Sequence, residues 1–199
     1  MDLVRRGAPN ANRVAILPAA WNPPTRAHLA LAQAALGYAG EVLLALPRIF
    51  PHKEFEHASF DLRLEWLRRI AAQRPGLGVA VTEGGLFLEM ARALRTADPR
   101  VEHIYIVCGR DAATRFLSWP YGSGAGAIEQ LREFSLLVAP RNEPFVTPAV
   151  LRDSIHELEL SPELRNISST EIRHRIGQGE PWTDWVPEEV VPEAGRIYR

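Results

Sequence analysis

The sequence predicts an α/β protein with a doubly wound parallel sheet, and two observations support this fold class. Short apolar runs, typical of strands buried on both faces, alternate with segments of helical spacing that are about 10 to 15 residues long. The chain has 199 residues, which is enough for one domain with a full core. We therefore expect a single domain over residues 1–199.

The first strand, turn and helix span residues 13–36. Val14 to Leu17 is an apolar run, and Pro23 and Pro24 then enforce a turn because each proline fixes its own φ. Thr25 is a good N-cap for the helix predicted over residues 26–36. A strand, a tight turn and a helix start in this order form an anion site, since free backbone N–H groups face one point.

The later elements continue the alternation. Apolar runs predict strands at 41–46, 77–82, 103–108 and 134–139. Helical spacing predicts helices at 60–72, capped by Ser59, and at 86–97, with a packing stripe of Leu86, Met90 and Leu94. Active sites of such sheets lie at the carboxyl ends of the strands. We therefore expect the polar turns after the 14–17 and 103–108 strands to face one crevice.

Charge and composition exclude several classes of function. A net charge of −1 argues against bulk binding to nucleic acid or to anionic membrane, and no apolar run reaches the length of a membrane span. The single cysteine, Cys108, excludes an intrachain disulfide and fits a reducing cytoplasm. Residues 1–12 lack the apolar segment of a signal peptide and are expected to be flexible. His52 and His57 have poor zinc spacing, so we predict no structural metal site.

The first helix carries a candidate catalytic pair. Thr25 and His28 are three residues apart and therefore share one face of the first turn. A hydroxyl and an imidazole that converge on a phosphate suit phosphoryl or nucleotidyl transfer, where the protein positions reactants and stabilises charge. The alternative is that Thr25 is only a cap and that His28 is a half-buried helix residue.

A second anion site is predicted in the C-terminal helical segment, residues 167–199. It begins I-S-S-T-E-I-R, in which Ser168 and Ser169 are N-cap residues and Arg173 lies one turn into a helix ended by Gly177. Hydroxyls and free N–H groups at a helix start, with an arginine on the same face, suit a phosphate. A plain capping box with a solvent-facing arginine is the alternative.

Both stretches resemble one family. W-N-P-P-T-R-A-H-L resembles the [H/T]-x-G-H signature of the nucleotidyltransferase superfamily, usually seen as G-G-T-F-[D/N]-P-x-H-x-G-H-L. I-S-S-T-E-I-R resembles its C-terminal motif, in the form most similar to bacterial nicotinate-mononucleotide adenylyltransferases. P-H-K at 51–53 and G-R-D at 109–111, followed by Trp119, resemble further segments in the same order.

The resemblance implies a Rossmann-like fold and an activity in NAD biosynthesis. An enzyme of this family transfers AMP from ATP, carried with Mg²⁺, to nicotinate mononucleotide and releases pyrophosphate. The implied catalytic residues are His28, Thr25 and Arg173. The implied ATP and phosphate contacts are Lys53, His52, Asp111, Gly109, Ser168, Ser169 and Thr170, and Trp119 is the implied acceptor contact.

The chain departs from the family pattern in two places. Pro18, Ala19 and Ala27 stand where the signature has glycines, and Gly84 to Met90 reads G-G-L-F-L-E-M where the family has a polar S-Y-T segment near the acceptor. Two alternatives therefore stay open. One is a related nucleotidyltransferase with another phosphorylated acceptor, and the other is a nucleotide-binding protein that has lost catalysis. The sequence does not indicate the oligomeric state.

Overall fold

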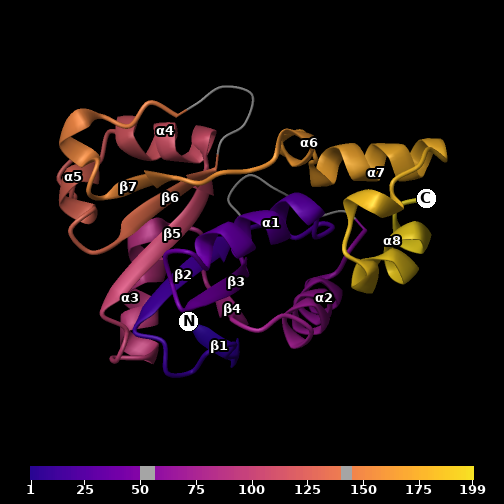
Figure 1. Cartoon of the computed structure of the whole chain (residues 1–199), viewed down its shortest axis with the longest axis horizontal. Helices are drawn as coiled ribbons and strands as arrows, with labels where there is room; N and C mark the ends of the chain where they lie inside the picture. Colours follow the sequence, from indigo (N-terminus) through magenta and orange to yellow (C-terminus); the bar gives the residue numbers. More distant parts are fainter. Residues whose placement is uncertain (50–56, 140–144) are drawn as a thin grey trace.

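The sheet follows the predicted α/β pattern. A computed structural model describes residues 1–49, 57–139 and 145–199 and contains a sheet of order β1-β4-β3-β2-β5-β6-β7 (Figure 1). The strands are β1 (Asp2–Arg5), β2 (Arg13–Pro18), β3 (Glu41–Pro47), β4 (Leu77–Thr82), β5 (His103–Gly109), β6 (Ser135–Ala139) and β7 (Ile155–Glu157). Strand β1 is antiparallel to β4, whereas every other neighbouring pair is parallel. The predicted fold class is confirmed.

Helices cover both faces of the sheet (Figure 1). The helices are α1 (Arg26–Ala35), α2 (Phe60–Ala72), α3 (Phe87–Ala97), α4 (Arg110–Ser118), α5 (Ala127–Gln130), α6 (Pro162–Arg165), α7 (Ser169–Gln178) and α8 (Val191–Ile197), with 3₁₀ turns at Ala149–Leu151, Thr183–Trp185 and Glu188–Val190. Helices α1, α2, α7 and α8 share one hydrophobic cluster with one face of the central strands, and α3 and α4 share another with the opposite face. This double covering explains why the central strands are apolar throughout.

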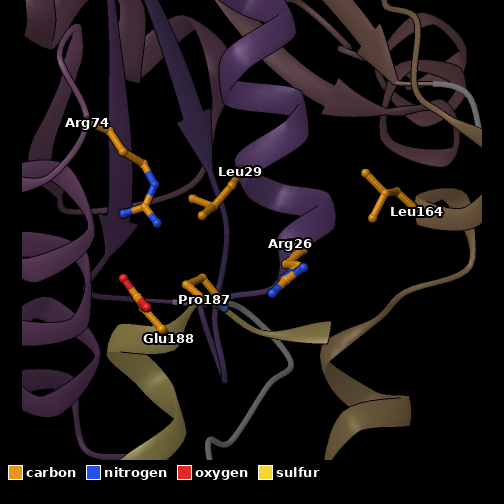
Figure 2. Close-up of a pocket in the computed structure, with 6 residues that line it drawn as sticks. All are labelled: Arg26, Leu29, Arg74, Leu164, Pro187 and Glu188. Carbon is orange, nitrogen blue, oxygen red and sulfur yellow. The ribbon is translucent and has the colours of Figure 1, made fainter. Parts of the chain in front are cut away.

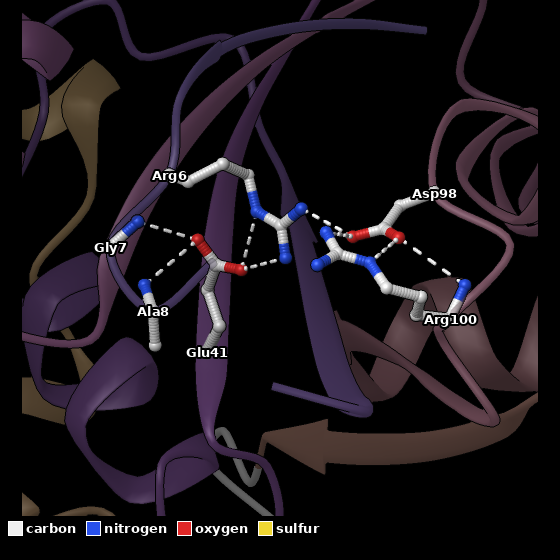
Figure 3. Close-up of polar contacts among 6 residues, drawn as sticks. All are labelled: Arg6, Gly7, Ala8, Glu41, Asp98 and Arg100. Atoms are coloured by element: carbon white, nitrogen blue, oxygen red, sulfur yellow. Dashed lines mark hydrogen bonds and ion pairs between the residues drawn. The ribbon is translucent and has the colours of Figure 1, made fainter. Parts of the chain in front are cut away.

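The N-terminus corrects the expectation of a flexible start at residues 1–12. Residues 2–5 form β1, and Arg6 behind it binds two buried carboxylates (Figure 3). Arg6 Nε donates to Glu41 Oε2 at 2.7 Å, and Arg6 Nη1 donates to Asp98 Oδ2 at 2.5 Å. Glu41 also accepts from the backbone of Gly7 and Ala8. A buried carboxylate needs such partners, and supplying them orders the N-terminal segment.

Three smaller expectations are also corrected. Gly179, at a left-handed φ of 71°, is the C-cap of α7, so Gly177 lies inside the helix. Leu86 is the N-cap of α3 and is 64% exposed, so only Met90 and Leu94 of the predicted stripe are buried. The segment expected to be a turn after β5 is instead the start of α4, because Gly109 passes directly into the helix.

Candidate active site

The site lies where the strand order reverses. Strands β2 and β5 are adjacent and parallel, with Ile16 paired to Ile106, while β3 lies on the other side of β2. Consequently the turn that leads into α1 and the start of α4 both lie at the carboxyl edge of these two strands. Ligands of doubly wound sheets bind at this position. The turn before α1 and the start of α4 therefore lie at the same edge of the sheet, and the crevice between them stays a prediction.

Thr25 and His28 form a reciprocal cap at the start of α1. The backbone N–H of His28 donates to Thr25 Oγ1 at 3.2 Å, and the backbone N–H of Thr25 donates to His28 Nδ1 at 3.1 Å. Histidine thus takes the place of the usual Glu or Gln of a capping box. Because Nδ1 accepts a hydrogen bond from the Thr25 backbone, the neutral ring carries its own proton on Nε2. The cap therefore uses Nδ1 and leaves the Nε2–H of His28 as a hydrogen-bond donor for another group.

The surroundings of His28 keep it neutral. Its ring centroid lies 4.9 Å from that of Trp21, which is fully buried. Burial lowers the pKa of His28 to about 4, because the low-dielectric surroundings disfavour the charged ring. Near pH 7, His28 can therefore offer a hydrogen bond but not a full positive charge. Thr25 itself is 0% exposed, so its hydroxyl faces His28 rather than solvent.

Side chains from other elements hold the turn before α1. Trp21 has a left-handed φ of 55°, uncommon for a bulky residue, and its indole N–H donates to the Ala45 carbonyl at 2.8 Å. Arg63 of α2 donates to the Ala20 carbonyl at 2.9 Å and is only 5% exposed. Burial lowers the pKa of Arg63, because low-dielectric surroundings disfavour the charged guanidinium. The hydrogen bond to the Ala20 carbonyl offsets part of the cost of burying this charge. The turn is thus held by side-chain donors although it lacks the family glycines.

The C-terminal segment supplies three more donors to the same turn. Ser169 Oγ donates to the Pro23 carbonyl at 2.7 Å, and Arg173 Nη1 donates to the Asn22 carbonyl at 2.7 Å. The Tyr198 hydroxyl donates to Asn22 Oδ1. The structure therefore brings the two predicted anion sites together.

The other predicted site residues divide into three groups. Ser168 accepts from the Glu171 backbone at 3.1 Å as the N-cap of α7, and Thr170 lies 3.4 Å from Arg173 Nη2. Gly109 and Asp111 lie at the start of α4, where a Cβ added to Gly109 would meet nothing within 4 Å. Lys53 and His52 lie outside the described residues.

Trp119 lies apart from the turn. It follows the last residue of α4, and its side chain is 58% exposed. Among the described residues, it shares no hydrogen bond or ring contact with the group around His28. Exposure of this size excludes the core role that a tryptophan usually has. The side chain is therefore available to a planar ligand.

Sequence reasoning missed two members of the site. Arg63 follows Leu62 of the apolar stripe of α2, so its position beside buried residues was the available signal. The contact between Tyr198 and Asn22 left no local signal, because the two residues are 176 positions apart. Only the folded chain brings them together.

A separate hollow lies on the outer side of α1. Its volume is about 420 Å³, and its lining residues are Arg26, Leu29, Arg74, Leu164, Pro187 and Glu188 (Figure 2). Among the predicted site residues that the structure describes, none lines it. In the described ranges no group of three or more His, Cys, Asp or Glu side chains could hold a metal ion, and no helix is long and apolar enough to cross a membrane.

Fold and site together define the class of protein. A helix start at the switch point of a doubly wound parallel sheet is a position where such folds bind nucleotides and other anions. The chain belongs to the cytidylyltransferase-like family, which it matches over residues 16–175. The predicted superfamily is confirmed.

Curated relatives of similar length carry one description. A probable nicotinate-nucleotide adenylyltransferase of Halalkalibacterium halodurans is 31% identical over 191 residues, covering 89% of this chain and 86% of the relative. A protein of the same description from Anaeromyxobacter dehalogenans is 30% identical over 200 residues, covering 94% and 96%. A third, from Thermotoga maritima, is 26% identical and covers 94% and 93%.

A solved structure shares the fold. The nicotinic acid mononucleotide adenylyltransferase of Plasmodium falciparum, complexed with NaAD, superposes with a TM-score of 0.65 and covers 94% of this chain and 97% of its own. Its sequence identity is 14%, so this likeness supports the architecture alone.

Proposed function

We propose that the protein transfers AMP from ATP to nicotinate mononucleotide, giving nicotinate adenine dinucleotide and pyrophosphate. The observation that carries the proposal is the position of His28. Its Nε2–H is set by the cap with Thr25, at a helix start on the switch point, and Arg173 binds the Asn22 carbonyl in the turn that leads into this helix. The names of the curated relatives support this acceptor.

The reaction is a direct displacement. An oxygen of the acceptor phosphate attacks the α-phosphorus of ATP and forms a new P–O bond, while the bond to the pyrophosphate oxygen breaks. His28 donates its Nε2–H to a phosphate oxygen as charge develops, and it is fixed before the substrate arrives. Since the Thr25 hydroxyl is buried against His28, we assign it to positioning His28 rather than to contacting phosphate.

The leaving group is held by α7. Arg173, the backbone N–H groups of residues 168–170 and the hydroxyls of Ser168 and Thr170 bind the β- and γ-phosphates, because a helix start and a guanidinium both favour anions. The Ser169 hydroxyl is already donated to the Pro23 carbonyl, so we assign it to holding the turn. Lys53 and His52 add positive charge to the same phosphates. Asp111 accepts from the ribose hydroxyls, and the open space beside Gly109 lets the nucleotide approach the backbone.

The divalent ion is carried by the nucleotide. Mg²⁺ would be bound by the triphosphate oxygens and by water, because this ion keeps several waters and is usually bound through substrate phosphates. The ion would neutralise part of the phosphate charge. The acceptor ring would stack on the exposed face of Trp119.

One experiment tests the function and separates the alternatives. Pyrophosphate release is measured with nicotinate mononucleotide, nicotinamide mononucleotide and phosphopantetheine side by side, with ATP and with CTP. Turnover with ATP and nicotinate mononucleotide supports the proposal. Turnover with another acceptor reassigns the substrate, whereas ATP binding without pyrophosphate release identifies a protein that has lost catalysis.

A further inference from the structure

The C-terminal segment holds both oxygens of Asn22. The Tyr198 hydroxyl donates to Asn22 Oδ1, and Arg173 Nη1 donates to the Asn22 carbonyl oxygen at 2.7 Å. Asn22 and Tyr198 are each only 5% exposed, so water competes poorly for the bond between their side chains. The two bonds together restrain the side chain and the backbone of Asn22.

Asn22 connects the two halves of the proposed site. Three residues after it, Thr25 caps α1 and accepts from the backbone of His28. Its carbonyl binds Arg173, which belongs to α7. A shift of Asn22 would therefore change the spacing between the imidazole of His28 and the guanidinium of Arg173.

We propose that Tyr198 is a positioning residue, which sets the spacing between His28 and Arg173 by holding Asn22. This inference rests on the proposed function, because the spacing matters only when both groups meet the same nucleotide. Burial raises the pKa of Tyr198, so its hydroxyl keeps the proton that it donates throughout the neutral range. The alternative is that the Tyr198 ring only fills the hydrophobic cluster behind α8.

Replacing Tyr198 with phenylalanine separates these two roles, because Phe keeps the ring and removes the hydroxyl. The Tyr198→Phe variant should lose about three- to tenfold in kcat/KM for ATP, the effect of one neutral hydrogen bond. Its dissociation constant for Mg-ATP, measured by calorimetry without acceptor, should rise by a similar factor. The KM for the acceptor should stay within about twofold, since Trp119 lies apart from this contact.

A matched control exists in the same chain. Tyr105 is 3% exposed, and its hydroxyl is bonded to Arg13 near the amino end of β5, away from the site. Tyr105→Phe therefore removes the hydroxyl of another buried tyrosine, which here accepts from the exposed Arg13, and it should leave the ATP parameters unchanged. An equal loss in Tyr105→Phe would show that any buried hydroxyl matters, and it would overturn the proposal.

Variants of Asn22 test whether Tyr198 acts through it. Asn22→Ala should match Tyr198→Phe, because each change removes the same bond between the two side chains. The double variant with Ala and Phe should lose no more than either single change, because the two residues share one bond. The positioning role would be rejected if the fold-losses in kcat/KM of the two single variants multiplied in the double variant. It would also be rejected if kcat/KM and the dissociation constant for ATP in Tyr198→Phe stayed within about twofold of the wild type. If the wild type fails to use the acceptor, the proposed function fails, but the ATP dissociation constants still decide this inference.

Discussion

Replacing His28 with glutamine separates its chemical role from its structural role. His28 accepts from the Thr25 backbone through Nδ1, and Gln is a usual residue at this position of a capping box. His28→Gln should therefore keep the helix start while it removes the imidazole Nε2–H from its position. His28→Ala should lose both, and the missing cap should cost about 1 kcal/mol of unfolding free energy.

The expected size of the catalytic loss follows from the role of a preorganised donor. Removing one such donor costs about 10²- to 10³-fold in kcat, or roughly 3–4 kcal/mol of transition-state stabilisation. Because the pKa of His28 is about 4, its protonation should not contribute to the pH dependence of kcat between pH 6 and 8. A neutral donor gives a flat profile in this range.

The same pKa makes a prediction about stability. The folded pKa of about 4 lies below the usual value of 6.5, so the unfolded chain binds more protons between these two pH values. The unfolding free energy should therefore fall as the pH drops from 6.5 through 4, by at most about 3.4 kcal/mol from this group. His28→Gln should remove that part of the acid sensitivity.

Two assays decide the role of His28. Pyrophosphate release gives kcat from pH 6 to 8, and urea denaturation gives the unfolding free energy from pH 4 to 7. If His28→Gln kept turnover near the wild-type value and instead lowered stability at pH 7, the residue would be structural and the reasoning refuted. A kcat that depends on a group titrating near pH 6.5, and that loses this dependence in His28→Gln, would contradict the neutral donor.

Three further predictions concern the nucleotide, the acceptor and the core. Arg173→Ala should weaken apparent ATP affinity by about 1.5–3 kcal/mol, and Arg173→Lys should not restore it, because only arginine offers a planar fork; an unchanged KM for ATP would exclude this role. Trp119→Ala should raise the acceptor KM about tenfold or more without changing the melting temperature, because the side chain is 58% exposed; equal loss for ATP would count against stacking. Arg6→Met leaves Glu41 and Asp98 without their shared cation and should cost about 3–5 kcal/mol of unfolding free energy in urea, whereas kcat per folded molecule should stay unchanged.

Most of the central sheet was predictable because its signals are local. Glu41–Pro47, Leu77–Thr82 and the helix Phe60–Ala72 agree with their apolar runs and helical spacing to within one residue. The pairing of Thr25 with His28 was also predictable, because the helical period alone places residues three apart on one face. The cap between them follows from the same local geometry.

The parts that were missed depend on distant partners or on where a helix begins. Strand β1 is short and polar at its ends, and the residues that hold Arg6 lie 35 and 92 positions away. The exposure of Leu86 follows from its place at the N-cap of α3, one residue before the helix begins. The contacts of Arg6 are tertiary, and no short window of sequence contains them. The exposure of Leu86 depends instead on where the helix begins, which is the least predictable part of an element.

The long separation between the turn and its donors has a consequence during synthesis. The bond from Arg173 to Asn22 spans 151 residues, and a ribosome adds about 5–20 residues per second. His28 is therefore synthesised roughly 7 to 28 seconds before Ser169, the first residue of α7. A nascent chain that ends before Ser169 lacks the donors that α7 and Tyr198 supply to the turn. Nucleotide chemistry should thus begin only after the last helix has emerged and docked.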